Sequence, residues 1–93
     1  MKIEWDPVKA NANIKKHGVS FEEAATALSD SMAVTGTDPD HSVYEERYIT
    51  FGLSNRNRLI VVSHTEEGET IRLISARKAS KGERELYEEE YKI

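Results

Sequence analysis

The spacing of apolar and polar positions predicts helices in the first third of the chain and strands in most of the remainder. Residues 2–5 alternate between polar and apolar side chains, which favours a short strand. Asp6 then precedes Pro7, and this pair is typical of a helix start, with Asp6 as the cap. Gly18 supplies the left-handed residue that ends many helices. A first helix is therefore expected over residues 7–17.

A second helix is predicted over residues 21–28. Ser20 and Glu23 have the spacing of a capping box, in which each side chain binds the other residue's backbone N–H. The apolar residues that follow recur at i, i+3, i+4 and i+7, as on one face of a helix; they are Phe21, Ala24, Ala25 and Leu28. The two helices are joined by a tight turn.

The remainder of the chain has the alternation of an antiparallel meander and ends in a helix. Strands are expected over residues 32–35, 47–53, 58–65 and 70–76, with turns at 54–57 and 66–69. In the strand over 47–53, Ile49, Phe51 and Leu53 share one face. A second capping box, Ser80 with Glu83, opens the final helix. That helix carries Leu86, Tyr87 and Tyr91.

This order of elements predicts an α+β fold with two N-terminal helices, an antiparallel sheet of three or four strands and a C-terminal helix. The short strand over residues 2–5 is an addition to that sheet. Helices packed on one face of the sheet satisfy the order. The 93 residues are expected to form a single domain over 1–93, because so short a chain rarely builds two cores.

Composition excludes several classes of protein. The chain has no cysteine, which rules out disulfides, thiolate metal sites and cysteine nucleophiles. It has no apolar run of the roughly 20 residues that cross a bilayer, and no signal-peptide pattern at its start. We therefore expect a cytoplasmic protein without a membrane partner.

Charge is distributed unevenly along the chain. The net charge is −4, but all six arginines lie at or after Arg47, and the segment over residues 47–82 is locally basic. A local basic patch decides phosphate binding more than the total charge does. The acidic remainder is either solvated surface or a surface that meets a basic partner.

Four of the arginines lie near the predicted sheet and suit a polyanion, because a guanidinium matches phosphate oxygens with its fork of donors. They are Arg47, Arg72, Arg77 and Arg84. The ordinary alternative is that each pairs with a nearby carboxylate. Arg72 is harder to explain in that way, because it lies in mid-strand between two apolar residues. Whether it shares a face with His64 depends on a register that the sequence leaves ambiguous by one residue.

The first and last helices offer further candidates. Lys9 and Lys16 share a helix face with Asn13, and this stripe is either solvated or lies against a phosphate backbone. His17 lies nearer the apolar side, where a histidine is more often packed than catalytic, although an imidazole is suited to proton transfer. Tyr87 has two alternatives to simple packing: stacking on a base or donating a proton.

A metal site is not expected. Asp38, Asp40 and His41 are close in sequence and include oxygen ligands for a hard cation. The loop is short, however, and the preference of Asp and Pro for turns explains it more simply. No nucleotide-binding motif is present either, so no cofactor is predicted.

Several blocks of residues resemble one known family over nearly the whole chain. They are EWDP at 4–7, KHGVSFEEA at 16–24, GLS at 52–54, IRLISARKA at 71–79, and Glu83-Arg84 with Tyr87. These blocks resemble the BrnT family of bacterial toxins. The chain departs from the family at Thr65-Glu66-Glu67, because many members have an arginine after Thr-Glu. One basic contact is therefore missing here or supplied elsewhere.

The resemblance implies a RelE-like fold and a toxin of a type II toxin–antitoxin pair, which cleaves RNA without a metal and halts translation. It also implies a BrnA-type ribbon-helix-helix antitoxin as partner, with operator DNA bound only through the toxin–antitoxin complex. Metal-free RNA cleavage needs cations on the phosphate and groups that move protons. The residues expected to stabilise the phosphate are Arg47, Arg72 and Arg77. Candidates for proton transfer are Lys16, His17, Arg84 and Tyr87, with His17 preferred. Lys9 and Lys16 are expected to bind the RNA backbone.

Two other functions stay open at the level of sequence. One is a non-catalytic module of the same fold that binds nucleic acid or an antitoxin, which the acidic total favours. The other is a DNA-binding regulator acting alone. The latter is the weaker alternative, because the helix over residues 21–28 carries Glu22 and Glu23, which phosphates would repel.

Overall fold

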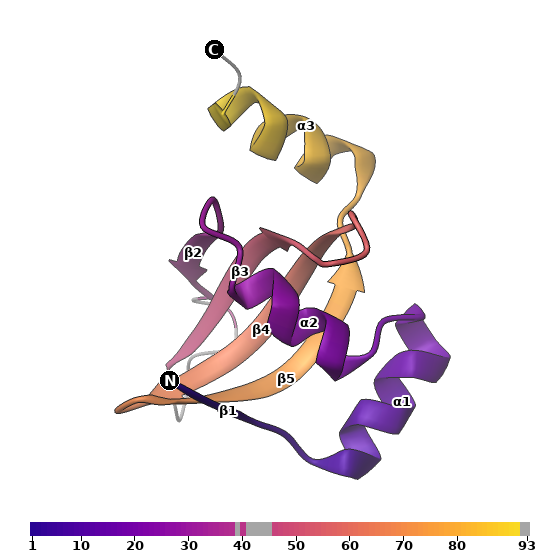
Figure 1. The fold of residues 1–93 in the computed structure, drawn as a ribbon, viewed down its shortest axis with the longest axis vertical. Helices are drawn as coiled ribbons and strands as arrows, with labels where there is room; N and C mark the ends of the chain where they lie inside the picture. Colours follow the sequence, from indigo (N-terminus) through magenta and orange to yellow (C-terminus); the bar gives the residue numbers. More distant parts are fainter. Residues whose placement is uncertain (39, 41–45, 92–93) are drawn as a thin grey trace.

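The structure is a computed structural model that describes residues 1–38, 40 and 46–91. Five strands form one sheet in the order β1-β5-β4-β3-β2, with β1 parallel to β5 and the other pairs antiparallel. Figure 1 shows α2 across one face of this sheet, α1 beside β5, and α3 beyond the end of β5. The elements are β1 (Lys2–Glu4), α1 (Pro7–His17), α2 (Phe21–Leu28), β2 (Val34–Thr37), β3 (Arg47–Leu53), β4 (Leu59–Glu67), β5 (Thr70–Lys78) and α3 (Lys81–Tyr91). The predicted α+β class is confirmed, and the short N-terminal strand is the fifth strand.

The first helix begins and ends where the sequence predicts. The Asp6 carboxylate accepts a hydrogen bond from the Val8 N–H at 2.9 Å, so a free donor of the first turn is satisfied. Gly18 has a φ of 69°, and its N–H donates to the Ile14 carbonyl at 2.8 Å. A left-handed glycine in this position closes the last turn and redirects the chain toward α2.

The strands differ from the prediction mainly at their ends. The strand expected over residues 32–35 occupies Val34–Thr37. β4 ends two residues later than expected, and β5 begins at Thr70 as predicted but continues to Lys78. Glu66 and Glu67 belong to β4, so the predicted turn over residues 66–69 was too long by two residues. Gly68, with a φ of 60°, allows this shorter turn.

A β-bulge interrupts the pairing of β4 with β5. Ser63 pairs with Ser75, whereas His64 pairs with Leu73, so Ile74 has no residue opposite it. An extra residue of this kind shifts the alternation of side chains along its own strand. Two residues of β5 that lie on opposite sides of Ile74 in sequence therefore point to the same face when an odd number of positions separates them.

The core lies between α1, α2 and one face of the sheet, which we call the covered face. Phe21 is completely buried there and meets Trp5 edge to face, with ring centroids 6.0 Å apart. Because of the bulge, Leu73 and Ala76 both point into this core although they lie three positions apart. The buried core residues are Ala10, Val19, Phe21, Ala24, Ala27, Ile60, Val62, Ile71, Leu73 and Ala76.

Gly52 allows α2 to approach the sheet closely. A Cβ atom at this position would lie 2.1 Å from the Ala27 carbonyl oxygen of α2, so only glycine fits. Gly52 pairs with Ile60, a core residue, and therefore faces the helices. Ile49 and Phe51 alternate with it and point to the opposite side, which we call the open face.

Asn13 attaches α1 to the edge of β5. Its side-chain amide donates to the carbonyls of Val19 and Ala76 at 2.9 and 2.8 Å, and its oxygen accepts from the Ala76 N–H at 3.1 Å. Ala76 pairs with Val62 of β4 on one side, and β1 reaches only residues 70–72 on the other side of β5. The Asn13 amide thus satisfies the Ala76 N–H and carbonyl on the side that no strand covers. Asn13 is buried, so the prediction that it belongs to a polar stripe with Lys9 and Lys16, either solvated or against a phosphate backbone, was wrong for Asn13.

Candidate nucleic-acid interface

Arginines from two strands form a row across the open face. Arg47 of β3 and Arg72 of β5 both pair with Thr65 of the strand between them. Directly paired residues point to the same side of a sheet. Adjacent strands lie about 4.8 Å apart, so the two arginine Cα atoms are separated by about 10 Å. Side chains as long as arginine can reach a single phosphate group from these two positions.

Arg77 lies on the same face because of the bulge. It pairs with Val61, which in turn pairs with Phe51 of the open face. In a regular strand Arg72 and Arg77 would point to opposite sides, since five is an odd spacing. The extra residue Ile74 reverses this, and three of the predicted phosphate-binding arginines share the open face.

Arg72 is exposed, and within the described part of the chain its side chain makes no hydrogen bond or ion pair. It lines a small hollow of about 220 Å³ together with Glu4 and Trp5. The ordinary alternative for this arginine, pairing with a nearby carboxylate, does not hold among the described residues. Its exposed guanidinium is therefore accessible to a ligand.

Arg77 follows the ordinary alternative. Its Nη1 and Nη2 atoms donate to the two carboxylate oxygens of Glu83 at 2.7 and 3.0 Å. This hydrogen bond from Arg77 is the main reason that the pKa of Glu83 falls to about 2, and the pKa of Arg77 is raised in turn. Glu83 therefore fixes the direction of the Arg77 side chain and uses part of its donor fork.

The predicted α1 residues lie apart from the arginine row. Lys9 and Lys16 are exposed, and His17 is half-buried at the end of the helix. The neighbour at that end is Arg58, which donates to the Gly18 carbonyl at 3.2 Å. Among the described residues, no hydrogen bond or ion pair joins His17 to an arginine of the open face.

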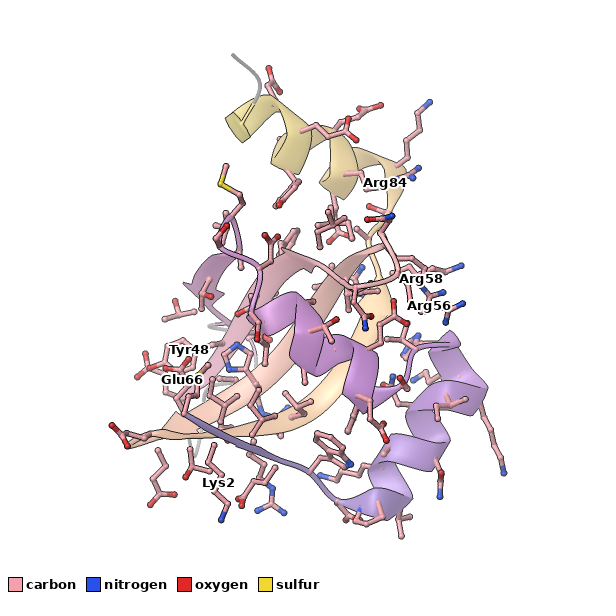
Figure 2. The ribbon with its side chains drawn as sticks, viewed as in Figure 1. Lys2, Tyr48, Arg56, Arg58, Glu66 and Arg84 are labelled. Carbon is pink, nitrogen blue, oxygen red and sulfur yellow. The ribbon has the colours of Figure 1, made fainter. Side chains whose placement is uncertain are left out.

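The two candidates on α3 have different surroundings. Arg84 is exposed, and Figure 2 shows it on the helix above the sheet. Tyr87 is half-buried, and its hydroxyl donates to the Asp30 carboxylate at 2.9 Å. Tyr87 also lines a groove with Phe51 of the open face, so α3 borders the face that carries the arginines.

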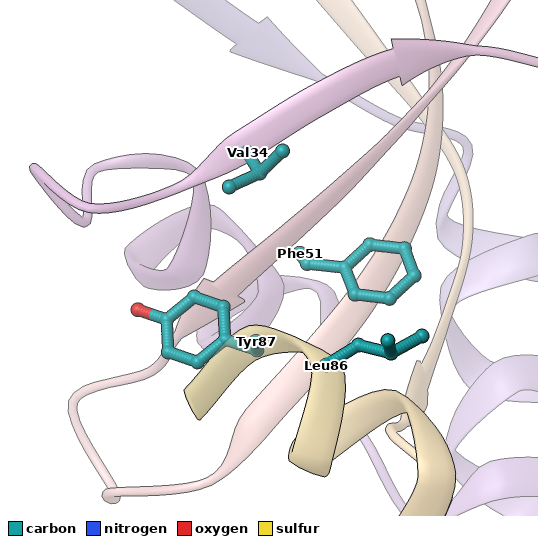
Figure 3. Close-up of a pocket in the computed structure, with 4 residues that line it drawn as sticks. All are labelled: Val34, Phe51, Leu86 and Tyr87. Carbon is teal, nitrogen blue, oxygen red and sulfur yellow. The ribbon is translucent and has the colours of Figure 1, made fainter. Parts of the chain in front are cut away.

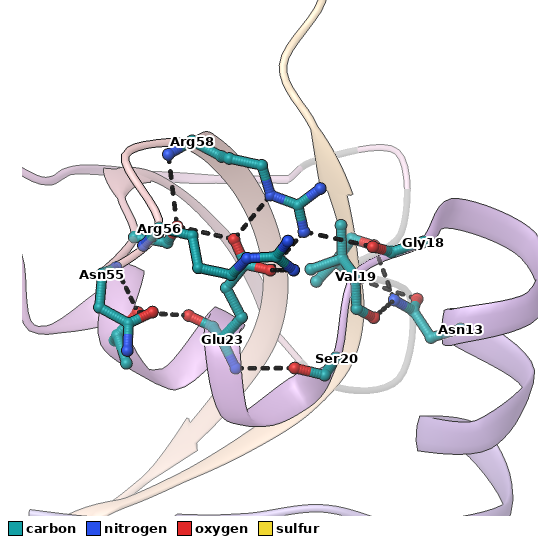
Figure 4. Close-up of polar contacts among 11 residues, drawn as sticks. Asn13, Gly18, Val19, Ser20, Glu23, Asn55, Arg56 and Arg58 are labelled. Atoms are coloured by element: carbon teal, nitrogen blue, oxygen red, sulfur yellow. Dashed lines mark hydrogen bonds and ion pairs between the residues drawn. The ribbon is translucent and has the colours of Figure 1, made fainter.

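The sequence did not reveal a buried ion pair between α2 and the turn after β3. Glu23 is 5% exposed, and both its oxygens bind the guanidinium of Arg58 (Figure 4). Ser54 donates to it at 2.7 Å, and Arg56 lies 3.6 Å away. The hydrogen bond from Arg58 is the largest influence that lowers the pKa of Glu23. Counting charges along the sequence cannot reveal this ion pair, because Glu23 and Arg58 are 35 residues apart.

A second buried polar group lies on the covered face. His64 is almost completely buried, its Nε2 lies 2.7 Å from the Thr50 hydroxyl, and its ring stacks on Tyr48. Burial lowers the pKa of His64. Since His64 pairs with Leu73 and Arg72 pairs with Thr65, His64 and Arg72 point to opposite faces. This settles the ambiguity left by the sequence and separates His64 from the arginine row.

Three further observations bear on the predictions made from the sequence. The described residues contain no group of three or more histidine, aspartate or glutamate side chains placed to hold a metal ion. His41 lies outside the described residues. No described helix has the length and apolar character needed to cross a membrane. Glu67, where the family resemblance leads us to expect an arginine, pairs with Thr70 two residues beyond Thr65 on β4.

Comparison with known proteins shows to which family the chain belongs. Residues 5–83 match the family described as ribonuclease toxin, BrnT, of type II toxin–antitoxin system. The chain belongs to the BrnT family. The 1.1 Å crystal structure of the Brucella abortus ribonuclease toxin BrnT is similar to it, with a TM-score of 0.63 and 32% sequence identity. The match covers 87% of this chain and 99% of that chain. No curated protein matches the chain.

Membership of the BrnT family confirms the resemblance that the sequence blocks carry. The family is one of ribonuclease toxins of type II toxin–antitoxin systems, so an antitoxin partner follows from it. The arginine row, the residues of α1 and the residues of α3 are candidates for the individual roles in such a toxin.

Proposed function

We propose that this BrnT-family chain is a metal-independent endoribonuclease that binds RNA on its open face and is neutralised by a BrnA-type ribbon-helix-helix antitoxin. The observation that supports the site is the row of Arg47 and Arg72, in which Arg72 is exposed and makes no bond within the described chain. In this proposal the complex with the antitoxin, and not the toxin alone, binds operator DNA. Cleavage of cellular RNA stops translation.

The arginine row supplies what metal-free cleavage needs most. The ribose 2′ oxygen attacks the neighbouring phosphorus, the 5′ oxygen of the next nucleotide leaves, and negative charge gathers on the phosphate oxygens. Two guanidiniums aimed at these oxygens stabilise that charge in the transition state. The attacking oxygen loses a proton and the leaving oxygen gains one, which leaves a cyclic phosphate and a free hydroxyl.

The other predicted residues take supporting positions in this proposal. Arg77, Arg84 and Tyr87 lie toward the α3 end of the open face, where they would contact the next part of the RNA or move a proton. Lys9, Lys16 and His17 lie on α1, where they would bind the backbone beyond the edge of the sheet.

Expression from a tightly repressed promoter, combined with cleavage of RNA by purified protein in EDTA, tests the proposal. The intact chain should arrest growth and fragment RNA in the presence of the chelator. Arg72→Ala and Arg47→Ala should each slow cleavage by about 100-fold, because each removes a charged donor from the phosphate. Arg56→Ala is the matched control, since it removes an arginine that is 66% exposed and lies outside the open face.

Two results would contradict the proposal in different ways. Cleavage that stops in EDTA and returns with magnesium would contradict metal independence. Unchanged cleavage by the Arg47→Ala and Arg72→Ala variants would move the site away from the open face.

A non-catalytic binding module is the second candidate. It is favoured by the engagement of Arg77 with Glu83 and by Glu67, which puts a negative charge where the family resemblance leads us to expect an arginine. Purified protein that binds RNA and leaves its length unchanged would support this function over cleavage.

A further inference from the structure

An apolar groove lies where α3 leans over the end of the open face. Its lining consists of Val34 from β2, Phe51 from β3, and Leu86 and Tyr87 from α3 (Figure 3). Its volume is about 280 Å³. This is room for one or two apolar side chains of another molecule.

Exposed apolar side chains gather around this groove. Among the described residues, seven large apolar side chains are strongly exposed, and four of them belong to this region: Met32, Val34, Leu53 and Leu86. Leu86 is 68% exposed. Single exposed apolar residues need no explanation, but a cluster around a groove is typical of an interaction surface.

Asp30 holds the region in one conformation. One of its oxygens accepts from the Met32 N–H at 3.0 Å. The other accepts from the Leu53 N–H at 2.8 Å and the Tyr87 hydroxyl at 2.9 Å. The carboxylate, just after α2, thus joins the end of β3 to the middle of α3 beside the groove. A groove that is already formed loses less conformational entropy when a partner binds.

The helix beside the groove carries an excess of negative charge. Glu85, Glu88 and Glu89 are exposed on α3, and within the described residues none of them forms an ion pair. No basic residue lies in the last turn of α3. Carboxylates are unfavourable at the C-terminal end of a helix, where the macrodipole is negative, so cations from a partner would stabilise this helix.

We propose that the apolar groove and the acidic side of α3 together dock a basic amphipathic segment of the antitoxin. The segment would place an apolar side chain among Val34, Phe51 and Leu86 and lysines or arginines beside the glutamates of α3. A second copy of this chain fits less well, because its own α3 would bring a like charge to the same place. The inference rests on the proposed antitoxin partner and adds the surface that receives it.

Binding of the purified ribbon-helix-helix antitoxin encoded beside this chain, measured by titration calorimetry, tests the inference. Leu86→Glu should weaken binding by about 30-fold or more, because it puts a charge at the centre of an apolar contact. Leu86→Ser should weaken it less, since it removes the apolar group without adding charge. Val8→Glu is the matched control, because Val8 is 75% exposed on α1, away from the groove, and should leave binding unchanged.

Charge is tested separately. The double variant Glu88→Lys/Glu89→Lys should weaken binding and reduce its dependence on salt, whereas Glu22→Lys on α2 should not. RNA cleavage by each variant, measured without antitoxin, should match that of the intact chain. A failure of cleavage in every variant and in the intact chain would contradict the proposed function but not the docking surface.

Two outcomes would overturn the inference. The first is antitoxin binding by Leu86→Glu that equals binding by the intact chain, with the variant folded by circular dichroism. The second is a change confined to self-association in sedimentation experiments, which would show that the groove joins two copies of this chain.

Discussion

The helices α2 and α3 begin with the same motif, yet the structure uses the two motifs differently. At α3, Ser80 and Glu83 form the complete reciprocal box: the Ser80 hydroxyl accepts from the Glu83 N–H at 3.2 Å, and the Glu83 carboxylate accepts from the Ser80 N–H at 2.9 Å. At α2, the Ser20 hydroxyl accepts from the Glu23 N–H at 3.0 Å. The Glu23 carboxylate, however, turns to Arg58 instead of to its own cap.

The difference shows how burial changes the role of one residue. Glu83 is at the surface, where it caps its helix and orients Arg77. Glu23 is buried, so its negative charge requires a close positive partner. Arg58, directly before β4, supplies that charge. One glutamate therefore stabilises a helix end, and the other joins a helix to the sheet.

The strongest test of this comparison is Glu23→Gln. The change leaves the Arg58 guanidinium without its charged partner, and breaking such a buried pair costs about 3 kcal/mol of unfolding free energy. Urea denaturation measures the loss. Glu22→Gln, on the exposed side of α2, is the control and should change stability by less than about 0.5 kcal/mol. An equally small change for Glu23→Gln would show that the pair contributes little.

A second test concerns how closely each helix approaches its neighbours. Gly52→Ala puts a methyl group against the Ala27 carbonyl, so α2 must move away from the sheet at a cost of about 2 kcal/mol. Gly82→Ala in α3 meets no atom within 4 Å and should be neutral or slightly stabilising. Thermal unfolding of both variants measures the difference. Equal melting temperatures would contradict the close contact of α2 with the sheet.

The capping box of Ser80 and Glu83 at the surface should contribute less to the unfolding free energy than the buried pair of Glu23 and Arg58. Glu83→Gln loses an ion pair whose arginine is 45% exposed, and pairs of this kind contribute at most about 1 kcal/mol. Hydrogen exchange should show faster exchange in the first turn of α3 and no change in α2. Equal acceleration in both helices would mean that α3 is not an independent part of the structure.

The smallest expected effect is the change with pH in the stability that Glu83 contributes. Its pKa is about 2 in the folded chain and near 4.5 when unfolded. The stabilisation is therefore complete above pH 4.5 and is lost as the pH falls toward 2. The stability difference between the intact chain and Glu83→Gln should shrink over this range. A difference that stays constant from pH 6 to pH 3 would contradict the lowered pKa.

Local signals in the sequence predicted the helices and β3 well. Asp6, Gly18 and Ser20 act on backbone groups a few residues away, so their effect is visible in the sequence itself. The same holds for the alternation in β3, whose bounds agree with the prediction. The family blocks predicted the protein class, because they cover nearly the whole chain.

Features that depend on distant partners were not predictable in this way. The bulge at Ile74 exists only in relation to β4, and it decides that Arg72 and Arg77 share a face. Asn13 resembled a solvent-facing residue until its contact with Ala76, 63 positions away, was known. The sequence thus identified the arginines of the candidate site by residue type, and only the register shows which of them can act together.

The parallel pairing of β1 with β5 also sets the order of events during synthesis. Lys2 pairs with Thr70, so the first strand cannot find its neighbour until 68 further residues have been made. At roughly 5–20 residues per second, this interval lasts about 3–14 seconds. Arg72 lies in the same late strand, and the arginine row is therefore completed only as the sheet closes. Until β5 has been synthesised, the chain cannot form the arginine row of the open face. The open face therefore assembles some seconds after synthesis begins.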